Sequence, residues 1–245
     1  MPKKQVSQDR KARIADLAQQ EKARERRVRL QIIAGCGVLL LLLAAGIGYA
    51  VLDARNQRPD VLIRTIGVPA SAATCDPITN DKASGNGKHV QPSATAKVKY
   101  DTVPPSTGSH FDQPSVSDRK FFTAQDRPQM EVLVHNLEHG YTVLWYDEAA
   151  GKAKKAELEE LAKVTNKIDA ALNKFIVSAW DPSYGKFPAD KKFALSHWSA
   201  TLAANGTSVT SQSGHRQLCG DLSGEVVHDF VKKHPRTSAP EPGAA

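Results

Sequence analysis

Two histidines four residues apart are the side chains of this sequence best suited to chemistry. They lie in the stretch VHNLEHGYTVLWY (134–146), where His135 and His139 enclose Glu138 in an H-x-x-E-H pattern. On a helix, both imidazoles would share one face and the carboxylate would lie beside a zinc-bound water, as in one class of metalloprotease. The pattern therefore indicates a zinc-dependent hydrolase, a metal site without hydrolysis, or a polar turn.

The residues on both sides of this motif favour strands over a helix. Segments 130–135 and 141–146 are rich in β-branched and aromatic residues, and Gly140 would end a helix at once. The sequence therefore predicts a hairpin whose five-residue loop 136–140 joins two strands. A hydrolase is then the least favoured interpretation, and no catalytic residue is predicted.

A metal site in this loop needs a third ligand from elsewhere in the chain. His110 is the best candidate, because two adjacent prolines stiffen the loop before it, and His197 is the second. We expect three imidazoles to face one another, those of His110, His135 and His139. Glu138 is expected as a fourth ligand or as a hydrogen-bond acceptor that orients one ring. Imidazole ligands outside the cell suit Cu(II) or Zn(II).

An interpretation without metal remains open beside this one. His135 and His139 can hydrogen-bond to backbone groups and hold the turn, with Asn136 doing the same and Gly140 completing the loop. The chain would then be a structural or interaction module of the cell envelope. The sequence leaves the protein partner unknown.

Positive charge is concentrated at the start of the chain. Residues 1–30 contain ten Lys or Arg and four Asp or Glu, so nearly all of the net charge of +7 lies there. The rest of the chain has no basic excess to spread along a phosphate backbone. A nucleic-acid partner is therefore not expected.

Residues 31–52 follow this basic tail and carry no charge over 22 residues. A helix of that length crosses the roughly 30 Å of a membrane's hydrocarbon core, and the apolar run is longer than that of a cleaved signal peptide. The positive charge in front of it predicts a cytoplasmic N-terminus. We expect an uncleaved single-pass anchor in the cell membrane, with all later residues extracytoplasmic.

The residues after the anchor predict one compact α+β domain with an antiparallel sheet. We expect a stalk over 53–74, the domain over 75–234, and a disordered tail over 235–245. The predicted regular elements are strands at 61–66, 96–102, 174–180 and 191–199, a helix through Leu158 and Leu172, and a last helix capped by Ser223.

The three cysteines divide between two environments. Cys36 lies in the apolar stretch, where it behaves as a small apolar residue. Cys75 and Cys219 lie beyond the anchor, in an oxidising compartment, and neither has a C-x-x-C neighbour. A Cys75–Cys219 disulfide is favoured over two free thiols that bind metal.

Three motifs together resemble a known family. A P-P-x-x-G-x-H loop ends at His110, VHNLEHG spans 134–140, and an Ala-Leu-Ser-x-Trp run spans 194–198. They resemble the uncharacterised bacterial family called domain of unknown function 3105, over roughly residues 60–200. The resemblance implies a shared architecture and no particular substrate. It also implies a site formed by Pro105, His110, His135, Glu138 and His139.

Overall fold

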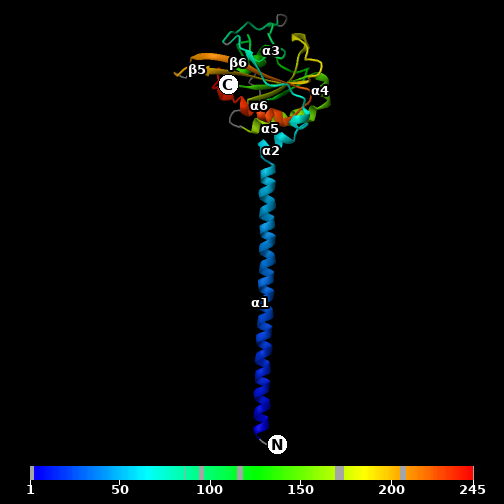
Figure 1. Ribbon diagram of the computed structural model, residues 1–245, viewed down its shortest axis with the longest axis vertical. Coiled ribbons are helices and arrows are strands. Elements are labelled where there is room, and N and C mark those ends of the chain that lie inside the picture. The colour runs from blue at the N-terminus through cyan, green and yellow to red at the C-terminus, as the bar shows by residue number, and fades with distance from the viewer. Residues whose placement is uncertain are drawn as a thin grey trace. The chain divides into compact units, whose positions relative to one another are not determined.

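The structure, a computed structural model, describes residues 3–85, 87–93, 97–114, 118–168, 174–204 and 208–244. The chain forms two compact units, Met1–Asn56 and Gln57–Ala245. The chain is therefore of the α+β class, in which one long N-terminal helix is followed by a domain built on a six-stranded sheet (Figure 1).

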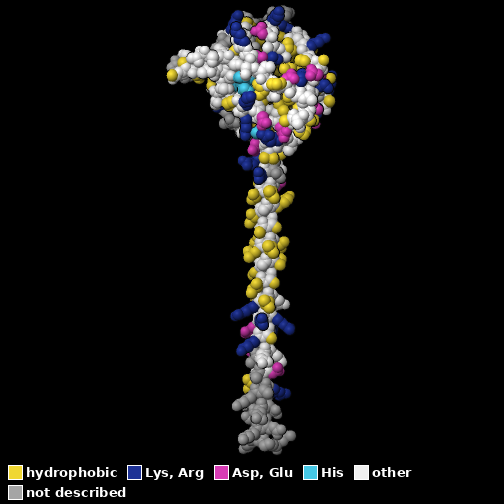
Figure 2. Space-filling model, in the orientation of Figure 1, with side chains coloured by type: hydrophobic (Ala, Val, Ile, Leu, Met, Phe, Trp, Pro, Cys, Tyr) yellow, Lys and Arg dark blue, Asp and Glu magenta, His cyan; other side chains and the backbone are white. Residues whose placement is uncertain are grey.

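The first unit is a single helix, α1 (Lys3–Asn56). Its segment Gln19–Arg55 is long and apolar enough to cross a membrane. Apolar side chains cover the uncharged stretch of this segment, whereas Lys and Arg lie along the part toward the N-terminus (Figure 2). The uncharged stretch 31–52 lies within this helix, as the sequence predicts.

The second unit is built on a mixed sheet in which the strands lie in the order β1-β6-β5-β3-β4-β2. The pairs β1–β6, β5–β6 and β3–β5 are antiparallel, whereas β3–β4 and β2–β4 are parallel. The strands are β1 (Thr79–Lys82), β2 (Phe121–Phe122), β3 (Thr142–Tyr146), β4 (Phe175–Ala179), β5 (Phe193–Leu202) and β6 (Val209–Cys219).

The expected antiparallel pairing therefore holds for β1, β6, β5 and β3, whereas β4 and β2 add parallel pairs that make the sheet mixed. Helices α4 (Glu148–Ala153) and α5 (Lys155–Ile168) lie between β3 and β4 in the chain. Such a helical crossover returns the chain to the end of the sheet at which β3 begins. Strand β4 therefore runs in the same direction as β3.

Helices cover both faces of this sheet. Leu144 and Tyr146 of β3 pack with α5 and with α6 (Gly224–Lys233), whereas Val143 and Trp145 pack with α3 (Met130–Glu138) on the other face. Figure 1 shows α3 on one side of the sheet and α5 and α6 on the other. This alternation follows from the period of two in a strand.

The predicted hairpin is wrong in its first half, because residues 130–138 form helix α3. Met130, Leu133, Val134 and Leu137 follow the helical spacing and are all buried against the sheet. Burial of this apolar face outweighs the β propensity of the individual residues. Gly140, with a φ of +89°, ends the helix and leads into β3, which confirms the second predicted strand.

Residues 57–74 of the expected stalk 53–74 and residues 235–244 of the expected tail belong to the second unit, whereas residues 53–56 end helix α1. Segment 61–66, predicted as a strand, contains the end of α2 (Pro59–Leu62) and a 3-10 turn, η1 (Ile63–Thr65). Ile63 is fully buried in the core. At the other end, a second 3-10 turn, η4 (Arg236–Ser238), precedes Ala239, which is also buried.

The remaining predicted elements are largely present. Strands β4 and β5 lie within the predicted segments or extend them, and Ser223 caps α6 by accepting a hydrogen bond from the Val226 N–H. Helix α5 contains Leu158, whereas Leu172 lies outside the described residues. Residues 97–102 of the expected strand 96–102 are irregular, and residue 96 lies outside the described residues.

The predicted disulfide is present. Cys75 and Cys219 are bonded across a sequence separation of 144 residues. The bond ties the segment before β1 to the end of β6, and the Asp76 N–H donates to the Leu218 carbonyl beside it, at 2.8 Å. Cys36, in α1, is free and exposed.

Candidate metal centre

Helix α3 supplies two side chains to the candidate site. His135 and Glu138 are three residues apart, so they lie on the same face of the helix. Glu138 is fully buried, and 4% of His135 is exposed. Leu133 and Leu137 hold the opposite face of α3 in the core, which fixes the direction of both polar side chains.

Two loop segments supply two further histidines. His89 and His110 form an isolated parallel β-bridge, in which the Val90 N–H donates to the His110 carbonyl at 2.7 Å. The His110 ring is fully buried and lies edge-on to Trp198, with 6.0 Å between ring centroids. The His89 ring is exposed and stacks on His135 at 5.1 Å.

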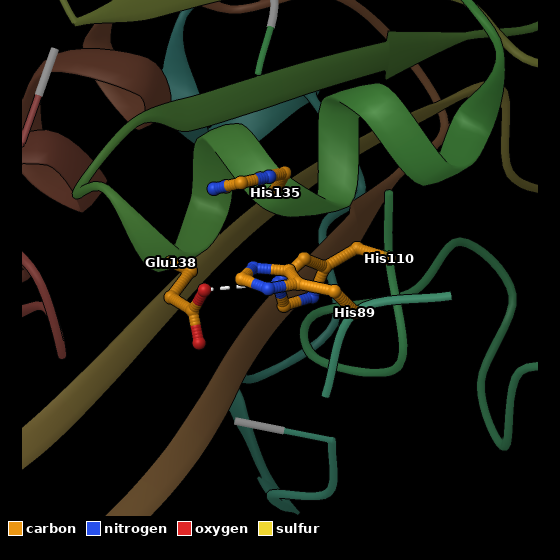
Figure 3. Close-up of side chains that lie close together, drawn as sticks. All are labelled: His89, His110, His135 and Glu138. Atoms are coloured by element: carbon orange, nitrogen blue, oxygen red, sulfur yellow. Dashed lines mark ion pairs between the residues drawn. The ribbon is translucent and has the colours of Figure 1, made fainter. Parts of the chain in front are cut away.

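These four side chains converge on one point (Figure 3). One nitrogen or oxygen atom from each of His89, His110, His135 and Glu138 lies within 4.8 Å of the others. Two atoms bonded at about 2.1 Å to the same tetrahedral zinc ion lie about 3.4 Å apart. The most distant atoms of the group therefore have to approach each other by up to about 1.4 Å to hold such an ion.

Backbone groups fix the orientation of the three buried side chains. Nδ1 of His110 lies 2.8 Å from the Gly108 carbonyl oxygen, and Nδ1 of His135 lies 2.5 Å from that of Phe111. Because a carbonyl only accepts, both Nδ1 atoms donate, which leaves Nε2 as the ligand atom of each neutral ring. On Glu138, Oε1 accepts from the Gly87 N–H at 2.7 Å and Oε2 remains.

The remaining atoms of His110 and Glu138 form an unusual buried contact. Nε2 of His110 lies 2.9 Å from Oε2 of Glu138, and neither atom has a hydrogen bond of normal geometry (Figure 3). In the neutral ring both atoms are acceptors, because Nδ1 already carries the proton. Two facing acceptors in a buried site require a proton or a metal cation between them.

The electrostatics of the site favour a neutral His135 and an ionised Glu138, the forms of these side chains that bind metal. Burial lowers the pKa of His135 to about 4, and the neighbouring His110 and His139 lower it further, so the ring is neutral near pH 7. Burial would raise the pKa of Glu138, but the neighbouring imidazole of His110 and the hydrogen bond from the Gly87 N–H outweigh it and lower that pKa. Glu138 is therefore a carboxylate.

His139 lies beside this group of four. Its Nε2 is 2.9 Å from Nε2 of His135 and 3.4 Å from Oε2 of Glu241 in the C-terminal segment. The H-x-x-E-H motif thus lies on a helix after all, and the strand argument against a hydrolase was wrong. The group of four, however, joins His135 and Glu138 to two loop histidines, an arrangement different from that of the protease motif.

Comparison with known proteins places the chain in a family. The family model described as "Protein of unknown function (DUF3105)" matches residues 89–245. The chain belongs to the DUF3105 family. The match covers more than half of the chain and contains all four residues of the candidate site. No curated protein and no solved structure matches the chain.

In the DUF3105 domain, three other predicted site residues lie in the segments that carry this group of four, and His197 does not. Pro105 is buried in the loop that leads to His110, and Asn136 is buried within α3. Gly140 lies at the end of α3, one residue beyond His139. His197 belongs to a different region, where Nδ1 lies 3.2 Å from Oγ1 of Thr142.

His89 is the site residue that sequence analysis missed. It lies in GKHV (87–90), a short segment with one histidine and no ligand spacing. The bridge to His110 brings it into the site, and such pairing between distant loops leaves no periodic signal in the sequence. The turn-forming Gly85 and Gly87 before it mark a loop and give no indication of the loop's partner.

Proposed function

We propose that this DUF3105 domain binds one Cu(II) or Zn(II) ion in an extracytoplasmic, membrane-anchored setting. The ion would lie among His89, His110, His135 and Glu138. The observation that carries the proposal is the buried contact between Nε2 of His110 and Oε2 of Glu138, two acceptor atoms 2.9 Å apart.

A shared proton explains this contact less completely than a metal ion does. A proton would create a buried imidazolium–carboxylate pair, whose desolvation cost is large. It would also serve two residues only, whereas four side chains converge here. Three imidazoles and one carboxylate, without sulfur, form a donor set typical of Zn(II) and Cu(II).

The number of available protein ligands favours metal binding over hydrolysis. Structural zinc sites have four protein ligands, whereas catalytic sites keep one position open for water or substrate. Here four protein residues are available for one ion. The exposed His89 is the ligand through which an ion could enter or leave, so we propose a role in metal binding or transfer.

Two features support the proposed location. Helix α1 is long and apolar enough to cross a membrane, and basic residues lie before its apolar part. The Cys75–Cys219 disulfide is stable in an oxidising compartment. We therefore propose a single-pass protein with a cytoplasmic N-terminus and an extracytoplasmic domain.

Metal analysis of the full chain in lipid nanodiscs tests the function. We expect about one ion per chain in the wild type and nearly none in His110→Ala. His215→Gln is the matched control, because His215 is half-buried and bonds to Asn80 and Ser199 away from the site. Equal metal content in all three proteins, or none, would leave a structural or interaction module as the function.

A further inference from the structure

A cavity at the C-terminal ends of α5 and α6 collects unsatisfied polar atoms. Within the described residues, five buried side-chain polar atoms have no hydrogen-bond partner, and two of them belong to the candidate metal centre. The other three are Oγ1 of Thr165, Nε2 of His234 and Nε of Arg236. All three residues line this one cavity. Such clustering calls for a common explanation, because buried polar atoms are normally paired.

The cavity has the size and the walls of a small-molecule site. Its volume is about 410 Å³, within the range of ligand pockets. Apolar side chains form much of its wall, namely Ile168, Phe175, Val231 and Pro235. An apolar body of modest size therefore fits against this wall.

The charged residues of the wall are all cations. Lys174, Lys232 and Arg236 line the cavity, and no acidic residue does. Among the described residues, none of these three cations forms an ion pair. The C-terminal ends of α5 and α6 offset at most about one unit of this charge. Positive charge therefore remains in excess.

Hydrogen bonds to carbonyl groups hold two of these cations in place. Nζ of Lys174 donates to the carbonyls of His139 and Ala244, and Nη1 of Arg236 donates to that of Pro242. Carbonyl dipoles satisfy these donors, and within the described ranges no carboxylate pairs with the formal charges. Burial, together with Arg236 and Lys120, lowers the pKa of Lys174, which agrees with an excess of cations.

We propose that this cavity binds a small amphipathic anion, an apolar body that carries one carboxylate or phosphate group. The apolar body packs on Phe175 and Val231, and the anionic group pairs with Arg236 and Lys232. This site is separate from the metal centre and does not depend on it.

Three naphthalene probes test the proposal, with binding followed by calorimetry on the full chain in nanodiscs. Naphthoate and naphthyl phosphate carry the two anionic groups, and naphthylmethanol is the neutral probe. We expect at least one anion to bind about tenfold more tightly than the neutral probe. The stronger anion identifies the headgroup.

Two variants and one control locate the binding site. Lys232→Gln and Arg236→Gln should each weaken binding of the stronger anion about tenfold. Lys233→Gln is the matched control, because Lys233 is an exposed neighbour that does not line the cavity, and it should bind like the wild type. The melting temperature of the Arg236→Gln variant shows whether this replacement disturbs the fold. Because Lys232 is exposed, Lys232→Gln tests the charge alone.

Two results would overturn the proposal. The first is a naphthylmethanol affinity equal to the affinities of both anions, or a failure of all three probes to bind. The second is unchanged anion binding in Lys232→Gln, or an equal loss in Lys233→Gln. Because metal content is measured on the same samples, failure here is distinguishable from failure of the metal site.

Discussion

At the candidate metal centre, backbone carbonyls fix the imidazoles of His110 and His135. Each ring donates from Nδ1 to a carbonyl, so its tautomer and its direction are set before any ion arrives. His89 differs, because its ring is exposed and its position depends on a short backbone bridge to His110. In the proposed metal site, His89 is therefore the ligand that can exchange.

A pair of alanine variants separates the ligand role of His89 from that of His139. We expect His89→Ala to weaken binding of Zn(II) about tenfold or more, a loss of about 1.4 kcal/mol, because one of four ligands is removed. His139→Ala should change the affinity by less than about threefold, because His139 lies outside the group of four and contacts Glu241. Competition with a coloured chelator measures both affinities. If His139→Ala weakened Zn(II) binding more than His89→Ala, the site would instead be formed by the H-x-x-E-H motif.

At the scale of the elements, α3 is positioned through its first turn. Glu131 is fully buried and accepts hydrogen bonds from the Val98 N–H at 2.9 Å and from the Tyr184 hydroxyl at 2.8 and 3.0 Å. These contacts fix the N-terminal end of the helix, and the apolar face fixes its rotation. His135 and Glu138, one turn later, are then directed toward the two loop histidines.

Removal of the Tyr184 hydroxyl should destabilise the domain. Tyr184→Phe leaves the buried Glu131 carboxylate with fewer partners, so we expect the free energy of unfolding to fall by about 1–3 kcal/mol. Tyr141→Phe is the matched control, because the Tyr141 hydroxyl makes no hydrogen bond to the part of the chain that the structure describes, so its removal should cost little. Urea unfolding of residues 57–245 measures the difference. Equal stability of both variants would show that the contact does not anchor α3.

At the scale of the whole folded unit, buried neutral histidines link stability to pH. Burial, with smaller contributions from His234 and His215, lowers the pKa of His197 from 6.5 to about 3. Its ring nitrogens face the hydroxyls of Thr142 and Ser238, which bring no compensating negative charge. Burial likewise lowers the pKa of His234 to about 4.

The metal-free domain should therefore lose stability as the pH falls from 6.5 toward about 4. In this window the unfolded chain binds protons at both histidines and the folded chain does not, so acid favours unfolding. Urea unfolding at several pH values gives the slope, and His197→Gln should make it shallower. Carboxylates with a lowered pKa, such as Asp181 at about 2, lose their contribution only at lower pH. A slope unchanged by His197→Gln would contradict this account.

Sequence alone was enough where the signal is local or compositional. The uncharged stretch 31–52 predicts an apolar helix, because length and the lack of charge need no knowledge of the fold. Ser223 predicts the start of α6, because a cap and its helix are neighbours in the chain. The Cys75–Cys219 disulfide followed from compartment and from the number of cysteines available.

Only the tertiary structure decided the candidate site. The residues 130–138 combine β-prone side chains with a helical spacing of apolar positions, and burial against the sheet selected the helix. The sequence predicted His110, His135 and Glu138 as neighbours, and the fold added His89 and placed His139 beside Glu241. Metal ligands must meet in space, and contacts between segments far apart in the chain are set by packing of the whole domain, which no local pattern records.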